Sequence, residues 1–136
     1  EMQSLRLTYC GAGHEWPLLI RVPQDRAVCE SDVQRLTADG MALGIDPDQR
    51  YPHGMVDLAP NDILVAFTDG LTDSNDFQQR RFGGTRLRRT LLEFLAREPR
   101  ATAAAIVEHV FWQLRQFSGL NRRVDDVTLV VMRVRE

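Results

Sequence analysis

The sequence contains no lysine, only two cysteines and no long apolar run. All 17 basic residues are arginines and are outnumbered by 19 acidic residues, which gives a formal net charge of -2. This balance argues against a general nucleic-acid-binding domain, because such domains carry a strong positive excess. No apolar run approaches the roughly 20 residues of a membrane span, so we expect no membrane association. Two cysteines, Cys10 and Cys29, do not make a disulfide framework, and we expect a reduced, cytoplasmic protein.

The size and composition of the chain indicate one folded domain. The 136 residues are 43% hydrophobic and 26% charged. These values are typical of globular domains and unlike those of disordered chains. A chain of this length holds one sizeable core and is too short for two.

Alternating or continuous apolar residues predict several short strands. Residues 5–10 and 18–22 flank a glycine-rich connection and are expected to form a hairpin. Residues 63–68 and 127–134 are nearly continuous apolar runs, which predicts strands buried on both faces. Two weaker strands are expected near residues 27–30 and 55–58.

Two later segments carry apolar residues at three- and four-residue steps. Residues 85–97 and 101–117 are therefore predicted as amphipathic helices. Gly83-Gly84 marks the start of the first helix, and Gly119 marks the end of the second. Strands followed by two helices and a final strand indicate an α+β fold with a mainly antiparallel sheet.

Acidic residues lie at one end of each of the two most apolar strands. Asp69 directly follows residues 63–68, and Asp125-Asp126 precedes residues 127–134. If these strands are antiparallel neighbours, Asp69 and Asp125 converge at one edge of the sheet. Two close carboxylates repel each other, and Mg²⁺ or Mn²⁺ would relieve that repulsion. Aspartate is also a common turn residue, and spacing alone favours that simpler role.

Five short blocks, in order along the chain, resemble the metal-dependent type 2C (PPM) protein phosphatases, and specifically their bacterial SpoIIE-type branch. Thr68-Asp69-Gly70 resembles the Thr-Asp-Gly motif of this family, and Asp125-Asp126-Val127-Thr128 resembles its last motif. The other three blocks are Gly11-Ala12-Gly13-His14 with Pro17, Gly40-Met41-Ala42-Leu43-Gly44, and Pro60-Asn61-Asp62. Gly11 stands where the family has asparagine, and Asn61 where it has glycine.

The resemblance implies a layered α-β-β-α sandwich, of which residues 1–136 are the C-terminal part, with mainly antiparallel strands and two helices. It implies that Asp69 and Asp125 ligate metal, with Gly70 and Asp126 as further candidates. The intact domain would hold two Mn²⁺ or Mg²⁺ ions and hydrolyse phosphoserine or phosphothreonine. No segment here matches the aspartate and Asp-Gly pair that the family carries in its N-terminal half.

The resemblance also implies partners. The substrate would be a phosphoprotein, typically an anti-sigma factor antagonist, and a sensory or receiver domain would precede the phosphatase domain. The absent half predicts that the isolated chain exposes apolar surface and forms a homodimer or aggregates. A catalytically inactive, phosphatase-like binding module is the alternative function.

Four other patterns receive simpler interpretations. Cys29 and Arg35 have the Cys-x5-Arg spacing of cysteine phosphatases, but Glu30 and Asp32 would oppose a thiolate there. Residues 73–76 are interpreted as a polar turn and not as a calcium loop. His14 is expected to stabilise its loop through a hydrogen bond, with general acid catalysis as the alternative. The arginines at positions 80, 81, 86, 88 and 89 either dock a phosphoprotein or form a solvated helix face, and composition favours the latter.

Overall fold

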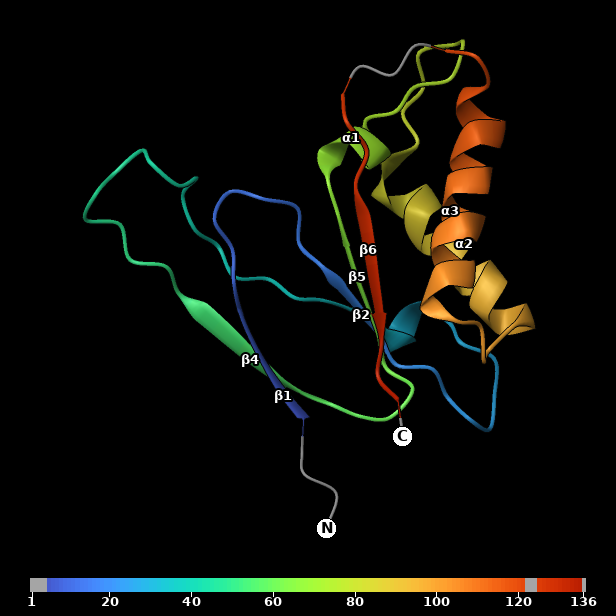
Figure 1. Ribbon diagram of the computed structural model, residues 1–136, viewed down its shortest axis with the longest axis horizontal. Helices are drawn as coiled ribbons and strands as arrows, with labels where there is room; N and C mark the ends of the chain where they lie inside the picture. The colour runs from blue at the N-terminus through green and yellow to red at the C-terminus, as the bar shows by residue number, and fades with distance from the viewer. Residues whose placement is uncertain (1–4, 122–124, 136) are drawn as a thin grey trace.

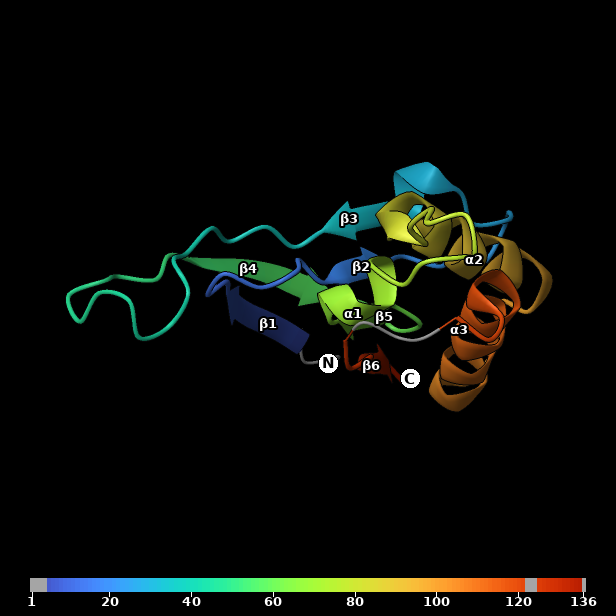
Figure 2. The same ribbon diagram turned by 90° about the horizontal axis from the view of Figure 1, so that it is seen from above.

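The computed structural model describes residues 5–121 and 125–135. Its larger sheet has the strand order β3-β2-β5-β6, and a separate ribbon pairs β1 with β4. Helices α2 and α3 cover one side of the larger sheet, and the β1–β4 ribbon lies on the other side (Figures 1 and 2). The elements are β1 (Leu5–Cys10), β2 (Leu18–Ile20), β3 (Val33–Arg35), β4 (His53–Leu58), β5 (Ile63–Phe67), α1 (Asp69–Thr72), α2 (Gly83–Arg97), α3 (Ala103–Ser118) and β6 (Leu129–Arg133).

The main core lies between the larger sheet and the two long helices. Alternate residues of β5, namely Ile63, Val65 and Phe67, are buried and belong to this core. The helices contribute side chains at helical spacing, so the predictions of helices at 85–97 and 101–117 are confirmed with small shifts of their ends. The buried helix residues in this core are Leu87, Leu91, Leu95, Ile106, Val110 and Leu114.

The ends of α3 follow from local chemistry. Thr102 precedes the helix with extended backbone angles, and its hydroxyl accepts a hydrogen bond from the backbone N–H of Ala105 at 3.2 Å. Gly119 follows the helix with a φ of 57°, a conformation that favours glycine.

The final strand is half-buried on one face and exposed on the other, so the prediction of a strand buried on both faces is wrong. Val130 is 57% exposed and Met132 is 40% exposed. Successive strand residues point to opposite faces, and only the face of β6 toward the helices is packed. Apolar composition alone therefore did not distinguish a half-buried strand from a fully buried one.

The predicted hairpin of residues 5–10 and 18–22 is also wrong. β1 pairs with β4 from Leu5↔Leu58 to Cys10↔His53, whereas β2 pairs with β3 and β5. The glycine-rich segment therefore carries the chain from one sheet to the other. A Cβ atom at Gly11 would overlap the carbonyl oxygen of Ala38, so this crossing requires glycine where the related motif has asparagine.

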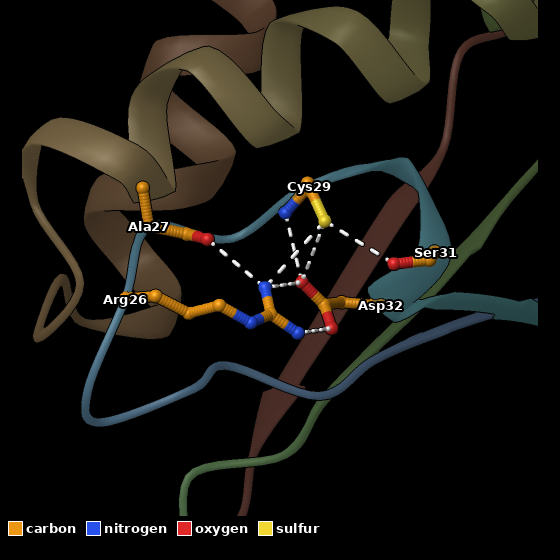
Figure 3. A network of polar contacts seen from close by, with 5 residues as sticks. All are labelled: Arg26, Ala27, Cys29, Ser31 and Asp32. Atoms are coloured by element: carbon orange, nitrogen blue, oxygen red, sulfur yellow. Dashed lines mark hydrogen bonds and ion pairs between the residues drawn. The ribbon is translucent and has the colours of Figure 1, made fainter.

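The strand expected near residues 27–30 is wrong as well. Residues Glu30–Asp32 form a 3-10 turn, and the strand begins at Val33. Figure 3 shows how the Asp32 carboxylate holds this turn. It accepts hydrogen bonds from the Arg26 guanidinium at 2.6 and 2.7 Å and from the backbone N–H of Cys29 at 2.8 Å. These bonds hold the pKa of Asp32 well below its usual range, and the bond from the Arg26 side chain contributes most.

The chain contains a short third helix that the sequence did not predict. Helix α1 spans Asp69–Thr72, directly after β5. None of the described helices is long and apolar enough to cross a bilayer.

Candidate metal centre

The ends of β5 and β6 bring the two candidate aspartates to one edge of the larger sheet. The strands are antiparallel, and their register runs from Ile63↔Arg133 to Phe67↔Leu129. Asp69 lies two residues beyond the end of β5, and Asp125 lies four residues before the start of β6. The expectation that these strands are antiparallel neighbours is therefore confirmed. In Figure 1 this edge lies at α1.

Both aspartates line one small cavity of about 180 Å³. Its walls come from α1, the loop after α1 and the segment before β6. The lining residues are Asp69, Gly70, Asp73, Ser74, Asn75, Arg81 and Asp125. Asp69 and Asp125 are separated by 55 residues in the sequence, yet the fold brings both carboxylates to this cavity from the ends of two different strands.

Thr68 fixes the relative position of the two segments. Its backbone N–H donates to the carbonyl of Thr128 at 3.1 Å, and its hydroxyl donates to the carbonyl of Asp126 at 3.2 Å. The same hydroxyl accepts from the backbone N–H of Thr128 at 3.0 Å. These bonds extend the β5–β6 ladder toward the cavity.

Gly70 lets the main chains of the two segments touch. A Cβ atom at this position would overlap the carbonyl oxygen of Asp126 and would lie 2.9 Å from its carbonyl carbon. Gly70 is buried, and its own carbonyl accepts the hydroxyl of Ser74 at 2.7 Å. Asp126 contributes its main-chain carbonyl to this contact. The Asp125 carboxylate accepts the backbone N–H of Asp126 at 2.7 Å, which orients it.

The oxygen chemistry of the cavity suits a hard divalent cation. Three carboxylates line the cavity, those of Asp69, Asp73 and Asp125, and Asn75 also lines it, with a buried side-chain oxygen for which the structure gives no hydrogen-bond donor. Mg²⁺ and Mn²⁺ prefer carboxylate and carbonyl oxygens of this kind. Within residues 5–121 and 125–135, no group of three His, Cys, Asp or Glu side chains is close enough to hold an ion. The described residues therefore fit part of a metal centre.

A second hollow of about 340 Å³ adjoins the first at Asp69. It is lined by Gly13, His14, Glu15, Trp16 and Asp69, so the Gly-Ala-Gly-His block meets the Thr-Asp-Gly block here. His14 is exposed, and its Nδ1 lies 3.5 Å from the carbonyl oxygen of Glu15. This contact is long for a hydrogen bond, and the role of His14 stays a prediction.

The loop after α1 is held by Asp76, which is buried. Its carboxylate accepts the backbone N–H groups of Gln78 and Arg80, each at 2.9 Å, and the Arg80 guanidinium at 2.7 Å. Burial raises the pKa of Asp76, but these hydrogen bonds outweigh it and the net pKa lies below the usual range. Asn75 and Arg81 face each other across this loop in an isolated antiparallel bridge.

Asn75 was interpreted as part of a polar turn, and Arg81 was weighed only as one of several arginines that could dock a phosphoprotein, so neither was predicted to lie at the metal site. Both reach the cavity because residues 73–76 fold back on residues 80–82, with Gln79 at a φ of 60° and the backbone N–H of Phe82 bound to the carbonyl of Ser74 at 2.8 Å. The sequence signal that could have pointed to these two residues was the Asp-rich polar turn of residues 73–76, followed by two arginines at positions 80 and 81.

The Cys29 thiol contacts both a basic and an acidic side chain: the Arg26 guanidinium donates to its sulfur at 3.5 Å, and the Asp32 carboxylate accepts from the thiol. Its sulfur is 3.3 Å from the Asp32 carboxylate and 3.2 Å from the Ser31 hydroxyl (Figure 3). A nucleophilic cysteine needs positive or N–H-rich surroundings that stabilise its thiolate. Arg26 is also bound by the Asp32 carboxylate at 2.6 and 2.7 Å, and the interpretation that this loop is not a cysteine phosphatase site stays a prediction.

The model of the SpoIIE family, described as Stage II sporulation protein E, matches residues 1–135. The chain belongs to the SpoIIE family. The resemblance carried by its five short blocks is therefore confirmed.

Proteins similar to this SpoIIE-family chain include phosphatases and solved phosphatase domains. Phosphoserine phosphatase RsbU of Bacillus subtilis is 28% identical over 132 residues, which are 97% of this chain and 36% of RsbU. The SiaA-PP2C domain of Pseudomonas aeruginosa superposes with a TM-score of 0.70 at 23% identity, covering 94% of this chain and 46% of that chain. The phosphatase domain of SpoIIE from Bacillus subtilis, presoaked with Mn, gives a TM-score of 0.60 at 14% identity, covering 100% of this chain and 54% of that chain.

These likenesses confirm the predicted fold class, a type 2C phosphatase fold with antiparallel sheets. The chain spans about a third of RsbU and just under half of the SiaA domain chain.

Proposed function

We propose that the full-length protein is a metal-dependent phosphatase that removes phosphate from phosphoserine or phosphothreonine, and that Asp69 and Asp125 ligate its metal ions. One observation carries the proposal: two family motifs, distant in sequence, line one cavity and contact each other through Gly70 and Asp126. Membership of the SpoIIE family and the likeness to RsbU support the reaction class.

In the proposed mechanism, Asp69 and Asp125 act as ionised oxygen ligands. Two Mn²⁺ or Mg²⁺ ions would lower the pKa of a bound water and offset negative charge on the phosphoryl oxygens. Gly70 keeps the two strand ends in contact, and Asp126 orients Asp125 through its backbone N–H. Two ions would need ligands in addition to those that the described residues supply.

The names of similar proteins support the proposed substrate and partners. RsbU is named a phosphoserine phosphatase. Another solved structure contains RsbU and RsbW domains of one protein from Mycobacterium tuberculosis. We therefore propose a regulatory phosphoprotein of the anti-sigma factor antagonist type as substrate, with a sensory or receiver domain in the same protein.

The test is Mn²⁺-dependent phosphate release from a phosphoserine protein by the full-length protein. Asp69→Asn and Asp125→Asn should each lower the rate at least about 100-fold, because a metal ligand loses its charge. Asp57→Asn is the matched control: it removes the exposed ion pair between Asp57 on β4 and Arg6 on β1 and should leave the rate within about twofold. Full activity of Asp69→Asn would show that the metal assignment is wrong.

A catalytically inactive binding module is the second candidate. The observation that favours it is the incomplete ligand set within the described residues. Calorimetry with Mn²⁺ on the 136-residue chain should give weak binding of one ion or none. Absence of Mn²⁺-dependent release by the wild-type full-length protein would favour this module over the phosphatase.

A further inference from the structure

The arginines of residues 80–89 do not act as one basic surface. Arg80 pairs with Asp76 at 2.6 Å, Arg88 with Glu30 at 2.7 Å, and Arg89 with Glu93 at 3.9 Å. Arg86 lies over the ring of Phe117, with its Cζ 4.4 Å from the ring centre. Arg81 is the member of this cluster that lines the cavity of Asp69 and Asp125.

Arg81 is held at the cavity by the backbone and by a weak ion pair. The Asp76-centred loop fixes its main chain opposite Asn75. Its guanidinium donates to the Asp73 carboxylate at 3.1 Å, and the two side chains are 70% and 51% exposed. Exposed pairs of this kind contribute between about 0 and 1 kcal/mol, so Asp73 holds Arg81 only loosely.

Arg81 is the basic side chain among the acidic residues that line the cavity. The lining residues include three carboxylates, those of Asp69, Asp73 and Asp125, and one basic side chain, that of Arg81. A phosphomonoester dianion entering this cavity would be repelled unless positive charge faced it. A guanidinium presents two parallel N–H groups that match two phosphoryl oxygens.

We infer that Arg81 contacts the phosphoryl group of the substrate and that Asp73 holds Arg81 in position until phosphate replaces it. This inference rests on the proposed phosphatase function, and it assigns to the same site a recognition residue for the phosphomonoester. In the free protein Arg81 donates to Asp73. In the complex its guanidinium donates to the phosphoryl oxygens, and Asp73 is released to solvent.

The experiment compares variants on both sides of the Arg81–Asp73 pair. Arg81→Gln should raise KM for a phosphoserine protein about tenfold while kcat changes less than about threefold, because a charge-assisted contact to phosphate is lost. Arg81→Lys should recover part of this loss, since lysine keeps the positive charge but lacks the two parallel N–H groups of a guanidinium. Asp73→Asn should leave KM unchanged or lower it, because it removes the competing carboxylate. Inorganic phosphate should inhibit Arg81→Gln correspondingly less than the wild type.

Opposite effects of the two substitutions separate substrate recognition from a structural ion pair. If Arg81→Gln and Asp73→Asn raise KM equally, the pair is structural and the inference is wrong. Arg89→Gln, which removes another exposed arginine pair, is the matched control and should match the wild type. Unfolding midpoints establish that each variant is folded.

The outcomes also separate this inference from the proposed function. A wild-type protein without Mn²⁺-dependent activity overturns both. An active wild type, with an unchanged KM in Arg81→Gln, overturns the role of Arg81 alone and leaves the metal assignment standing.

Discussion

Gly70→Ala is the most direct test of how the candidate metal centre is assembled. The new Cβ would overlap the carbonyl oxygen of Asp126 and lie 2.9 Å from its carbonyl carbon. Carbon atoms in contact lie about 3.5–4.0 Å apart, so the Asp125-Asp126 segment must retreat by roughly 0.6 Å or more. The obstacle is a main-chain carbonyl, which cannot turn away as a flexible side chain would.

The cost of this displacement follows from the contacts that it disturbs. Overpacking a well-packed site costs about 1–3 kcal/mol. Retreat of the carbonyl also weakens the hydrogen bond from the Thr68 hydroxyl, at 3.2 Å, and such bonds contribute about 0.5–1.5 kcal/mol each. Replacing a helical glycine by alanine returns at most about 1 kcal/mol, and α1 is only four residues long. We therefore expect a net loss of about 1–3 kcal/mol of stability, together with weaker Mn²⁺ binding.

Gly84→Ala is the matched control for Gly70→Ala. Gly84 also lies in a helix, and its Cβ would meet only the Arg88 guanidinium at 3.8 Å, an ordinary contact. This variant should be stabilised by about 0.5–1 kcal/mol. The assay is urea unfolding of the full-length protein with Mn²⁺ calorimetry on the same samples. If Gly70→Ala is as stable as Gly84→Ala and binds Mn²⁺ like the wild type, the main-chain contact does not build the site.

Three further predictions concern the core, the exposed sheet face and the loop after α1. Leu91→Ala, at a fully buried position, should lower the free energy of unfolding by about 2–5 kcal/mol, whereas Leu120→Ala, 97% exposed, should change it by less than about 0.5 kcal/mol in the same urea titration. The isolated 136-residue chain should self-associate, and Val130→Thr with Met132→Gln should shift it toward monomer in light scattering; a wild-type chain that is already monodisperse and monomeric would contradict this. Because the folded pKa of Asp76 is lowered, its stabilisation is present above the ordinary aspartate pKa of about 3.9 and is lost as pH falls through the lowered value. Asp76→Asn should therefore remove part of the acid sensitivity seen in unfolding midpoints between about pH 2 and 6.

The parts of the fold that the sequence predicted are those set by local periodicity. The spacing of Leu87, Leu91 and Leu95 marks one helical face, and this face is buried. The apolar run of residues 63–68 and the carboxylate after it placed Asp69 at a strand end. Asp125 precedes a similar apolar run, residues 127–134, and antiparallel pairing of the two runs was the arrangement that would bring Asp125 beside Asp69. These inferences needed only side-chain character and spacing.

The errors concern which strands pair, and pairing depends on distant residues. Residues 5–10 pair with residues 53–58 of β4, far away in the sequence, and not with the nearby residues 18–22. The decisive contact, between Gly11 and the carbonyl of Ala38, leaves no periodic trace in the sequence. Burial of β6 was overestimated for a related reason: an apolar run does not reveal whether a second layer covers it.

The cavity residues show the same limit at the scale of one loop. Asp69 and Asp125 were found through motifs, whereas Asn75 and Arg81 reach the cavity through the fold of the loop after α1. That fold depends on the buried carboxylate of Asp76 and on the positive φ of Gln79. Neither property can be recognised from residue types in order.

The antiparallel register of β5 and β6 has a consequence for folding. A slip of one residue would turn the core side chains of β6 toward solvent, but a slip of two would keep the same face inward. A slip of two residues would displace Asp125 by about 7 Å relative to Asp69, since a strand rises about 3.3 Å per residue. A cation shared by these two aspartates would bind only the correctly aligned pair, so metal binding would select the native alignment of the last strand.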